Sequence, residues 1–213
     1  MFRHVFSLGL LLASLVTSSA APPEWWVSRG ATVANPTNNN AAVNQGQLKQ
    51  FTQKAVLELN ARIPGGAGPE LNDLVIGWIQ VYQDGGYSAS NPLAADLLAM
   101  NTGQLKWIAS KIHARLVFAK YEAASPAWLV QNAATDGLLA NLGQLKTIFN
   151  FDLTAPTGQL PGWWLELYFN GQSTTNPSSD ADGDGMSNTT EYARGLDPIK
   201  KDNPKLLLEV TTE

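Results

Sequence analysis

One hexapeptide pattern, Asn-x-Gly-Gln-Leu-Lys, occurs three times in the chain: Asn44-Gln45-Gly46-Gln47-Leu48-Lys49, Asn101-Thr102-Gly103-Gln104-Leu105-Lys106 and Asn141-Leu142-Gly143-Gln144-Leu145-Lys146. Asparagine is favoured as a helix N-cap because its side-chain oxygen accepts a hydrogen bond from a free backbone N–H group of the first turn. Glutamine follows three residues later in every copy, which is the spacing of a capping box. Each copy therefore predicts the beginning of a helix.

Glycine occupies the second helical position of every copy, as Gly46, Gly103 and Gly143. Glycine destabilises a helix because the unfolded chain gains more freedom there than with any other residue. Its recurrence therefore predicts that another segment comes close to the backbone at this position.

Apolar residues continue with helical spacing after the repeats, and they predict a mainly α fold. The run after the third repeat is shorter and stops near Asp152. We expect residues 21–153 to form one helical region in which the three repeat units pack together without a site of their own. The apolar positions are Leu48, Phe51, Ala55, Leu59 and Ile63, then Leu105, Ile108, Ala109, Ile112 and Leu116, then Leu145, Ile148 and Phe149.

Residues 1–20 have the composition of a secretory signal peptide. Arg3 and His4 precede an apolar run, and Ala20 ends a run of small residues suited to cleavage. The apolar run is too short for a comfortable membrane span, and no later segment approaches one. We expect an exported protein, secreted or at the cell surface, with no membrane span after signal removal.

The charge composition argues against nucleic acid as a partner. The chain has 14 Lys and Arg residues against 18 Asp and Glu, without a basic cluster, so we do not expect it to bind nucleic acid. It also contains no cysteine. Exported proteins without disulfides need another means of holding small modules together, and a bound metal ion is one such means.

The stretch from Asp180 to Glu191 matches the twelve-residue calcium pattern D-x-D-x-D-G-x5-E. Carboxylates at alternate positions of a tight loop supply hard oxygen ligands, and Gly185 permits the sharp bend. We expect Ca²⁺ to be bound through carboxylate oxygens, one backbone carbonyl and one amide that binds directly or through water. The predicted ligands are Asp180, Asp182, Asp184, the carbonyl of Met186, Asn188 and Glu191.

The flanks of this loop predict an EF-hand-like module over residues 162–199, joined to the helical region by a linker at 154–161. A short helix follows Gly162, and a second begins near Asn188 and ends before Gly195. No second loop is present to pair with the first. This favours a structural calcium clip over a switch. Residues 200–213 form a tail, and residues 206–210 within it have the composition of a strand.

The segment from Pro161 through the loop to Pro198 resembles the thrombospondin type 3-like or EF-hand-like calcium repeats of exported bacterial proteins. The hexapeptide repeats resemble a region near the N-terminus of large exported proteins in Verrucomicrobia-like bacteria. The first resemblance implies calcium ligation by Asp180, Asp182, Asp184, Asn188 and Glu191. The second resemblance does not indicate an activity.

Two other functions are compatible with the sequence. The chain has seven tryptophans, and the pairs Trp25-Trp26 and Trp163-Trp164 either anchor helices in a core or offer exposed faces to a glycan or cell-wall partner. A hydrolase would need two carboxylates at a defined separation, for which Glu24, Asp136 and Glu166 are candidates. Because no motif supplies a catalytic set, we expect a protein that is not an enzyme.

Overall fold

The computed structural model describes residues 22–32, 37–82, 92–122, 127–130, 132–155, 158–172 and 174–201. Within these ranges the chain is mainly α-helical and has no β-strand, which confirms the predicted fold class in its coarse form. The predicted signal peptide at 1–20 and the strand-like residues 206–210 lie outside the described residues.

The three hexapeptides begin the three helices that form the centre of the fold, α2 (Gln45–Arg62), α4 (Thr102–Phe118) and α6 (Leu142–Phe149). In the first copy the amide of Gln47 donates to Oδ1 of Asn44 at 2.8 Å, and the amide of Asn44 donates to Oε1 of Gln47 at 3.0 Å. The same reciprocal pair is present in the other two copies. The predicted capping boxes are therefore confirmed.

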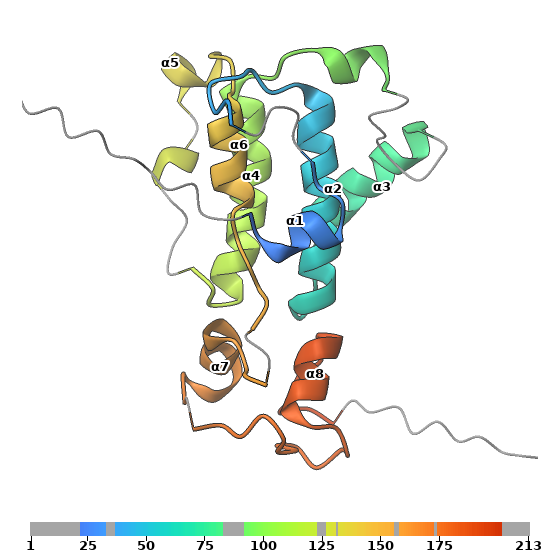
Figure 1. Ribbon diagram of the computed structural model, residues 1–213, viewed down its shortest axis with the longest axis vertical. Coiled ribbons are helices and arrows are strands. Elements are labelled where there is room, and N and C mark those ends of the chain that lie inside the picture. Colours follow the sequence, from blue (N-terminus) through green and yellow to red (C-terminus); the bar gives the residue numbers. More distant parts are fainter. Residues whose placement is uncertain are drawn as a thin grey trace, which may run out of the picture.

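A closed ring of backbone hydrogen bonds joins the residues that precede the three caps. The amide of Val43 donates to the carbonyl of Ala140 at 3.0 Å, that of Ala140 to Met100 at 3.0 Å, and that of Met100 to Val43 at 2.9 Å. All three residues are fully buried. The ring brings the three helix N-termini together, and the helices then run side by side in the same direction (Figure 1).

The recurrence of glycine at the second helical position of the repeats is explained by contacts near this ring. A Cβ atom on Gly103 would lie 3.0 Å from Cβ of Asp136, and one on Gly143 would lie 3.3 Å from both Cβ and the carbonyl oxygen of Asn39. The amide of Gly143 also donates to that carbonyl at 2.8 Å. The predicted close approach is thus confirmed for the second and third copies.

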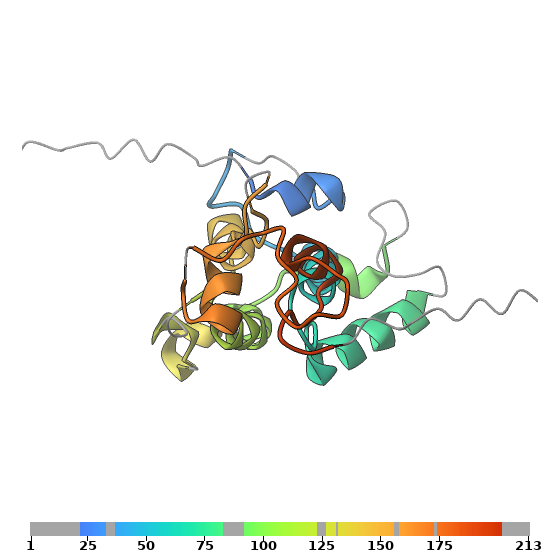
Figure 2. The same cartoon turned by 90° about the horizontal axis from the view of Figure 1, so that it is seen from below.

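Shorter elements surround this centre. Helix α3 packs beside α2, and α7 and α8 lie beyond the C-terminal ends of the central helices, α7 below α4 and α6 and α8 below α2 (Figures 1 and 2). The bounds of the remaining elements are α1 (Glu24–Ser28), α3 (Pro69–Tyr82), the 3-10 turns η1 (Ala94–Leu97) and η2 (Ala127–Leu129), α5 (Ala133–Asp136), α7 (Gly162–Phe169) and α8 (Asn188–Arg194).

Both tryptophan pairs lie in the core. The indole N–H of Trp25 donates to the carbonyl of Phe151 at 2.7 Å, and that of Trp26 donates to the carbonyl of Phe149 at 2.9 Å. These bonds hold α1 across the end of α6. Trp163 and Trp164 are buried in the same continuous apolar cluster. A tryptophan whose polar N–H is paired and whose rings are buried serves as a core anchor.

Candidate metal centre

Three aspartates come together in the loop between α7 and α8. Carboxylate oxygens of Asp180, Asp182 and Asp184 lie within 4.8 Å of one another. Asp180 is exposed, while the other two are partly buried. Three like charges at this separation repel one another, and a cation placed among them would remove that repulsion.

Backbone amides fix the first of these carboxylates. Both oxygens of Asp180 accept hydrogen bonds, from the amides of Gly183 at 2.7 Å, Asp184 at 3.2 Å and Gly185 at 2.8 Å. These bonds, the one from Gly185 first, hold the pKa of Asp180 below its usual value. Gly185 has φ of +98°, a conformation that favours glycine, so the predicted bend is confirmed.

One oxygen of the second carboxylate, that of Asp182, receives no hydrogen bond. Asp182 accepts from the amide of Asp184 through Oδ1 at 3.0 Å, but its Oδ2 is buried and accepts no hydrogen bond. Burial, with the charges of Asp184 and Asp180 acting in the same direction, raises the pKa of Asp182. Burial makes the charged form of this carboxylate less favourable than it is in water. A bound cation would therefore stabilise this carboxylate more than it would stabilise a fully solvated one.

The end of the loop supplies a buried amide and a buried acid. Asn188 and Glu191 open helix α8, and they are 1% and 0% exposed. The amide nitrogen of Asn188 donates to the carbonyl of Asn176 at 2.9 Å, which fixes the side chain, whereas its Oδ1 is buried and receives no hydrogen bond. Glu191 is not a member of the three-aspartate group.

Met186 has a packing role in addition to the carbonyl predicted as a ligand. Its side chain is buried, and a guanidinium nitrogen of Arg194 lies 3.2 Å from its sulfur. Its amide donates to Oδ1 of Asp184 at 2.8 Å. The residue therefore ties the middle of the loop to the last turn of α8.

Two residues ahead of the loop also position it, and the calcium pattern did not indicate them. The amide of Asn188 donates to the carbonyl of Ser179 at 2.8 Å, and its side chain reaches Asn176. The loop is thus closed at its base by contacts from an otherwise irregular segment. Backbone carbonyls carry no sequence signal, so these partners could be found only in the structure.

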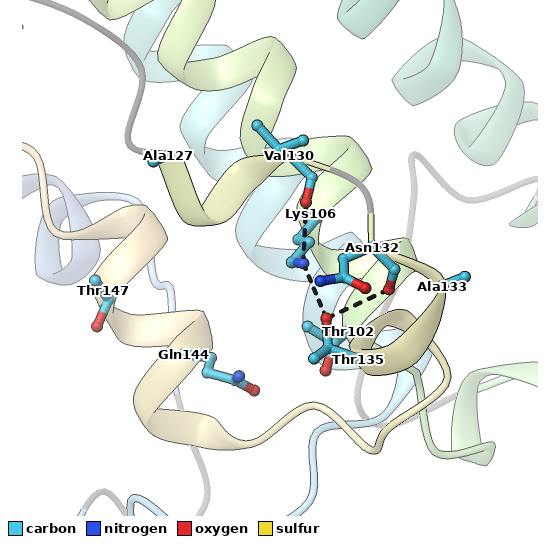
Figure 3. A pocket seen from close by; sticks show the side chains of 9 residues that line it. All are labelled: Thr102, Lys106, Ala127, Val130, Asn132, Ala133, Thr135, Gln144 and Thr147. Carbon is cyan, nitrogen blue, oxygen red and sulfur yellow. Dashed lines mark hydrogen bonds between the residues drawn. The ribbon is translucent and has the colours of Figure 1, made fainter.

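A separate cavity of about 770 Å³ lies between α4 and α6 (Figure 3). The charged side chain that lines it, Lys106, donates to Oδ1 of Asp136 at 2.8 Å, to the carbonyl of Val130 at 3.2 Å and to Oγ1 of Thr135 at 3.4 Å. The ammonium group is therefore already engaged. The residues that line the cavity are Thr102, Lys106, Ala127, Val130, Asn132, Ala133, Thr135, Gln144 and Thr147.

The three carboxylates considered for hydrolysis lie on different elements. Glu24 is on α1, Asp136 on α5 and Glu166 on α7, and α5 and α7 are at opposite ends of the molecule (Figure 1). Glu24 and Glu166 are exposed, and Asp136 is paired with Lys106. The structure does not bring these three residues together.

Among the helices in the described ranges, none combines the length and the apolar character that crossing a membrane requires. No protein family matches the chain, and neither a curated protein nor a solved structure shows significant similarity to it.

Proposed function

We propose that this chain is an exported structural or interaction module in which residues 162–199 form an EF-hand-like unit that binds Ca²⁺ as a stabilising clip. The buried Oδ1 of Asn188, which receives no hydrogen bond, is the observation that carries the proposal. A buried polar oxygen costs free energy unless it finds a partner, and a metal ion is such a partner.

The donor set suits calcium. Asp180, Asp182 and Asp184 offer carboxylates, Asn188 an amide oxygen and Met186 a backbone carbonyl, and the buried Glu191 closes the predicted pattern. All of these are hard oxygen donors on an irregular loop without octahedral symmetry, which Ca²⁺ accepts more readily than Mg²⁺. Calcium would neutralise the clustered charge and satisfy the buried oxygens.

The surroundings favour a clip over a switch. Helix α8 is short and ends at Gly195, which has φ of +66°. It packs against α2, whereas the helices of a sensor hand open when calcium binds. Sites of this extracellular kind bind calcium with Kd of about 10⁻⁴–10⁻³ M.

The glycan alternative loses the observation on which it rested. Trp25, Trp26, Trp163 and Trp164 are all less than a tenth exposed. Trp107 is 45% exposed, but it lies on α4 with the ammonium group of Lys111 5.8 Å from the ring centre. A single aromatic face of this kind is common on protein surfaces.

Thermal unfolding of residues 21–213 in calcium and in EDTA tests the proposal. At a calcium concentration ten times Kd, mass action adds about 1.4 kcal/mol to the free energy of unfolding. We expect this gain in the native sequence and in Asp73→Asn, which changes an exposed acid on α3, and its loss in Asp182→Asn. An unfolding temperature that does not respond to calcium would refute the clip.

A further inference from the structure

Helix α8 is part of both the calcium loop and the apolar core of the helical region. Its first turn contains Asn188 and Glu191 from the calcium pattern, and the next residue, Tyr192, is buried in the core of the helical region. Because both parts lie within two turns of one rigid helix, a movement of the loop's last ligands moves Tyr192 as well.

Tyr192 is held by the segment that follows α6. Its hydroxyl donates to the carbonyl of Leu153 at 2.7 Å, and the indole N–H of Trp163 donates to the same carbonyl at 3.2 Å. The ring packs edge-on against Trp163 and Trp164, with centroids 6.3 and 6.2 Å away. One carbonyl oxygen thus joins α7, α8 and the end of the central helices.

The last turn of α2 forms the other side of this interface. The guanidinium carbon of Arg62 lies 5.5 Å from the ring centre of Tyr192. Glu58 pairs with Arg62 at 3.4 Å and with Arg29 at 2.6 Å. A Cβ atom on Gly195 would lie 3.2 Å from the carbonyl oxygen of Ala61, so the end of α8 also contacts the backbone of α2.

We infer that calcium in the loop controls the docking of α8 onto α2 and onto the segment around Leu153. This inference rests on the proposed calcium function and specifies which contacts elsewhere in the fold calcium would control. Without a cation, repulsion among the three aspartates opposes the loop conformation that leads into α8. With calcium bound, α8 is fixed, and the interface at Tyr192 forms with it.

The consequence is a thermodynamic coupling between the loop and the far end of α2. If docking accompanies binding, the measured calcium affinity includes the free energy of the contacts that Tyr192 makes. Weakening those contacts must then weaken calcium binding, although Tyr192 offers no ligand to the ion.

The test combines titration calorimetry with amide hydrogen exchange on residues 21–213, using Ca²⁺ and EDTA. We expect calcium to slow exchange about fivefold or more at the C-terminal turn of α2, where the amide of Ile63 donates to Leu59, as well as in the loop. The amide of Gln104, in the cap of α4 at the opposite end of the molecule, should not respond.

Two variants that each remove one hydroxyl group bound to a backbone carbonyl supply the matched comparison. Tyr192→Phe removes the hydroxyl bound to Leu153 and should weaken calcium affinity about twofold to tenfold, the contribution of one hydrogen bond. Thr102→Val removes a hydroxyl that donates to the carbonyl of Leu138 at 3.1 Å, at the N-terminal end of α4 and away from α8. It should leave calcium affinity unchanged.

The outcomes separate the two proposals. Calcium binding with slowed exchange confined to residues 180–191, or with equal affinity in Tyr192→Phe and the native sequence, would overturn the inference and leave the clip intact. An absence of calcium binding in the native sequence would overturn both.

Discussion

The side chain of Lys49 donates to Oδ1 of Asp96 at 2.7 Å and joins the first repeat to the segment just before the second. Lys106 reaches Asp136 before the third repeat at 2.8 Å, and Lys146 reaches Oδ1 of Asn39 before the first at 2.8 Å. The last residue of each hexapeptide therefore contacts the equivalent position of the next unit. The lysine donors run from the first unit to the second, third and back to the first, which is the reverse of the order in which the backbone donors of the ring run.

Removing the lysine should have a different effect in the first and third copies. The carboxylate of Asp96 is fully buried, so Lys49→Met removes the ion-pair partner of a buried charge and should lower the free energy of unfolding by about 3–5 kcal/mol. Lys146 binds a neutral, exposed partner, so Lys146→Met should cost about 1 kcal/mol or less. Urea unfolding of both variants measures this, and equal losses would contradict the role given to Asp96.

The repeat glycines should not tolerate a methyl group. Gly103→Ala places Cβ 3.0 Å from Cβ of Asp136, and overpacking of this kind costs about 1–3 kcal/mol. Gly77, inside α3, has no neighbour within 4 Å of a Cβ, so Gly77→Ala should stabilise the protein by about 0.5–1 kcal/mol. Thermal unfolding of the two variants gives the comparison. A stabilising Gly103→Ala would show that the approach of Asp136 is not what selects glycine.

The local features of this fold were predictable from sequence, whereas the contacts between distant segments were not. Asn44 and Gln47 predict a cap because both partners lie within one turn. Gly103 indicates a close approach but not that Asp136 makes it, since nothing near Gly103 specifies a residue so far along the chain. The bond from Val43 to Ala140 uses backbone groups that every residue carries, so the ring has no sequence signature.

The candidate site likewise combines features that the sequence predicts with features that only the fold determines. The spacing of Asp180, Asp182 and Gly185 predicts a bent acidic loop, which the structure contains. The buried environment of Asn188 depends on Asn176 and on the packing of α8, and neither follows from the calcium pattern. The tryptophan pairs stayed ambiguous because an indole can serve a surface or a core, and burial depends on the whole fold.

Stability should depend on pH through Asp136. The hydrogen bond from Lys106, followed by that from the amide of Asn132, lowers the pKa of this carboxyl in the folded protein, while burial opposes the shift. A lowered pKa stabilises the fold above the ordinary aspartate pKa of about 3.9, and this contribution is lost as pH falls through the folded value. The difference in unfolding free energy between the native sequence and Asp136→Asn should therefore be largest near neutral pH and shrink in acid. A difference that is constant across this range would contradict the assignment.

The contact between Lys146 and Asn39 can be changed into an ion pair like those of the other two repeat lysines. Asn39 stands where the other units have Asp96 and Asp136, and its side chain already accepts from Lys146. Asn39→Asp keeps the shape of that acceptor and adds an ion pair at an exposed position, which typically contributes about 0–1 kcal/mol. We expect a small rise in the urea midpoint that disappears at high salt, because screening weakens exposed pairs. Asn39→Asp in a Lys146→Met background is the control, since it adds the charge without the partner. A stabilisation that persists in this background would mean that the gain comes from somewhere other than closure of the ring.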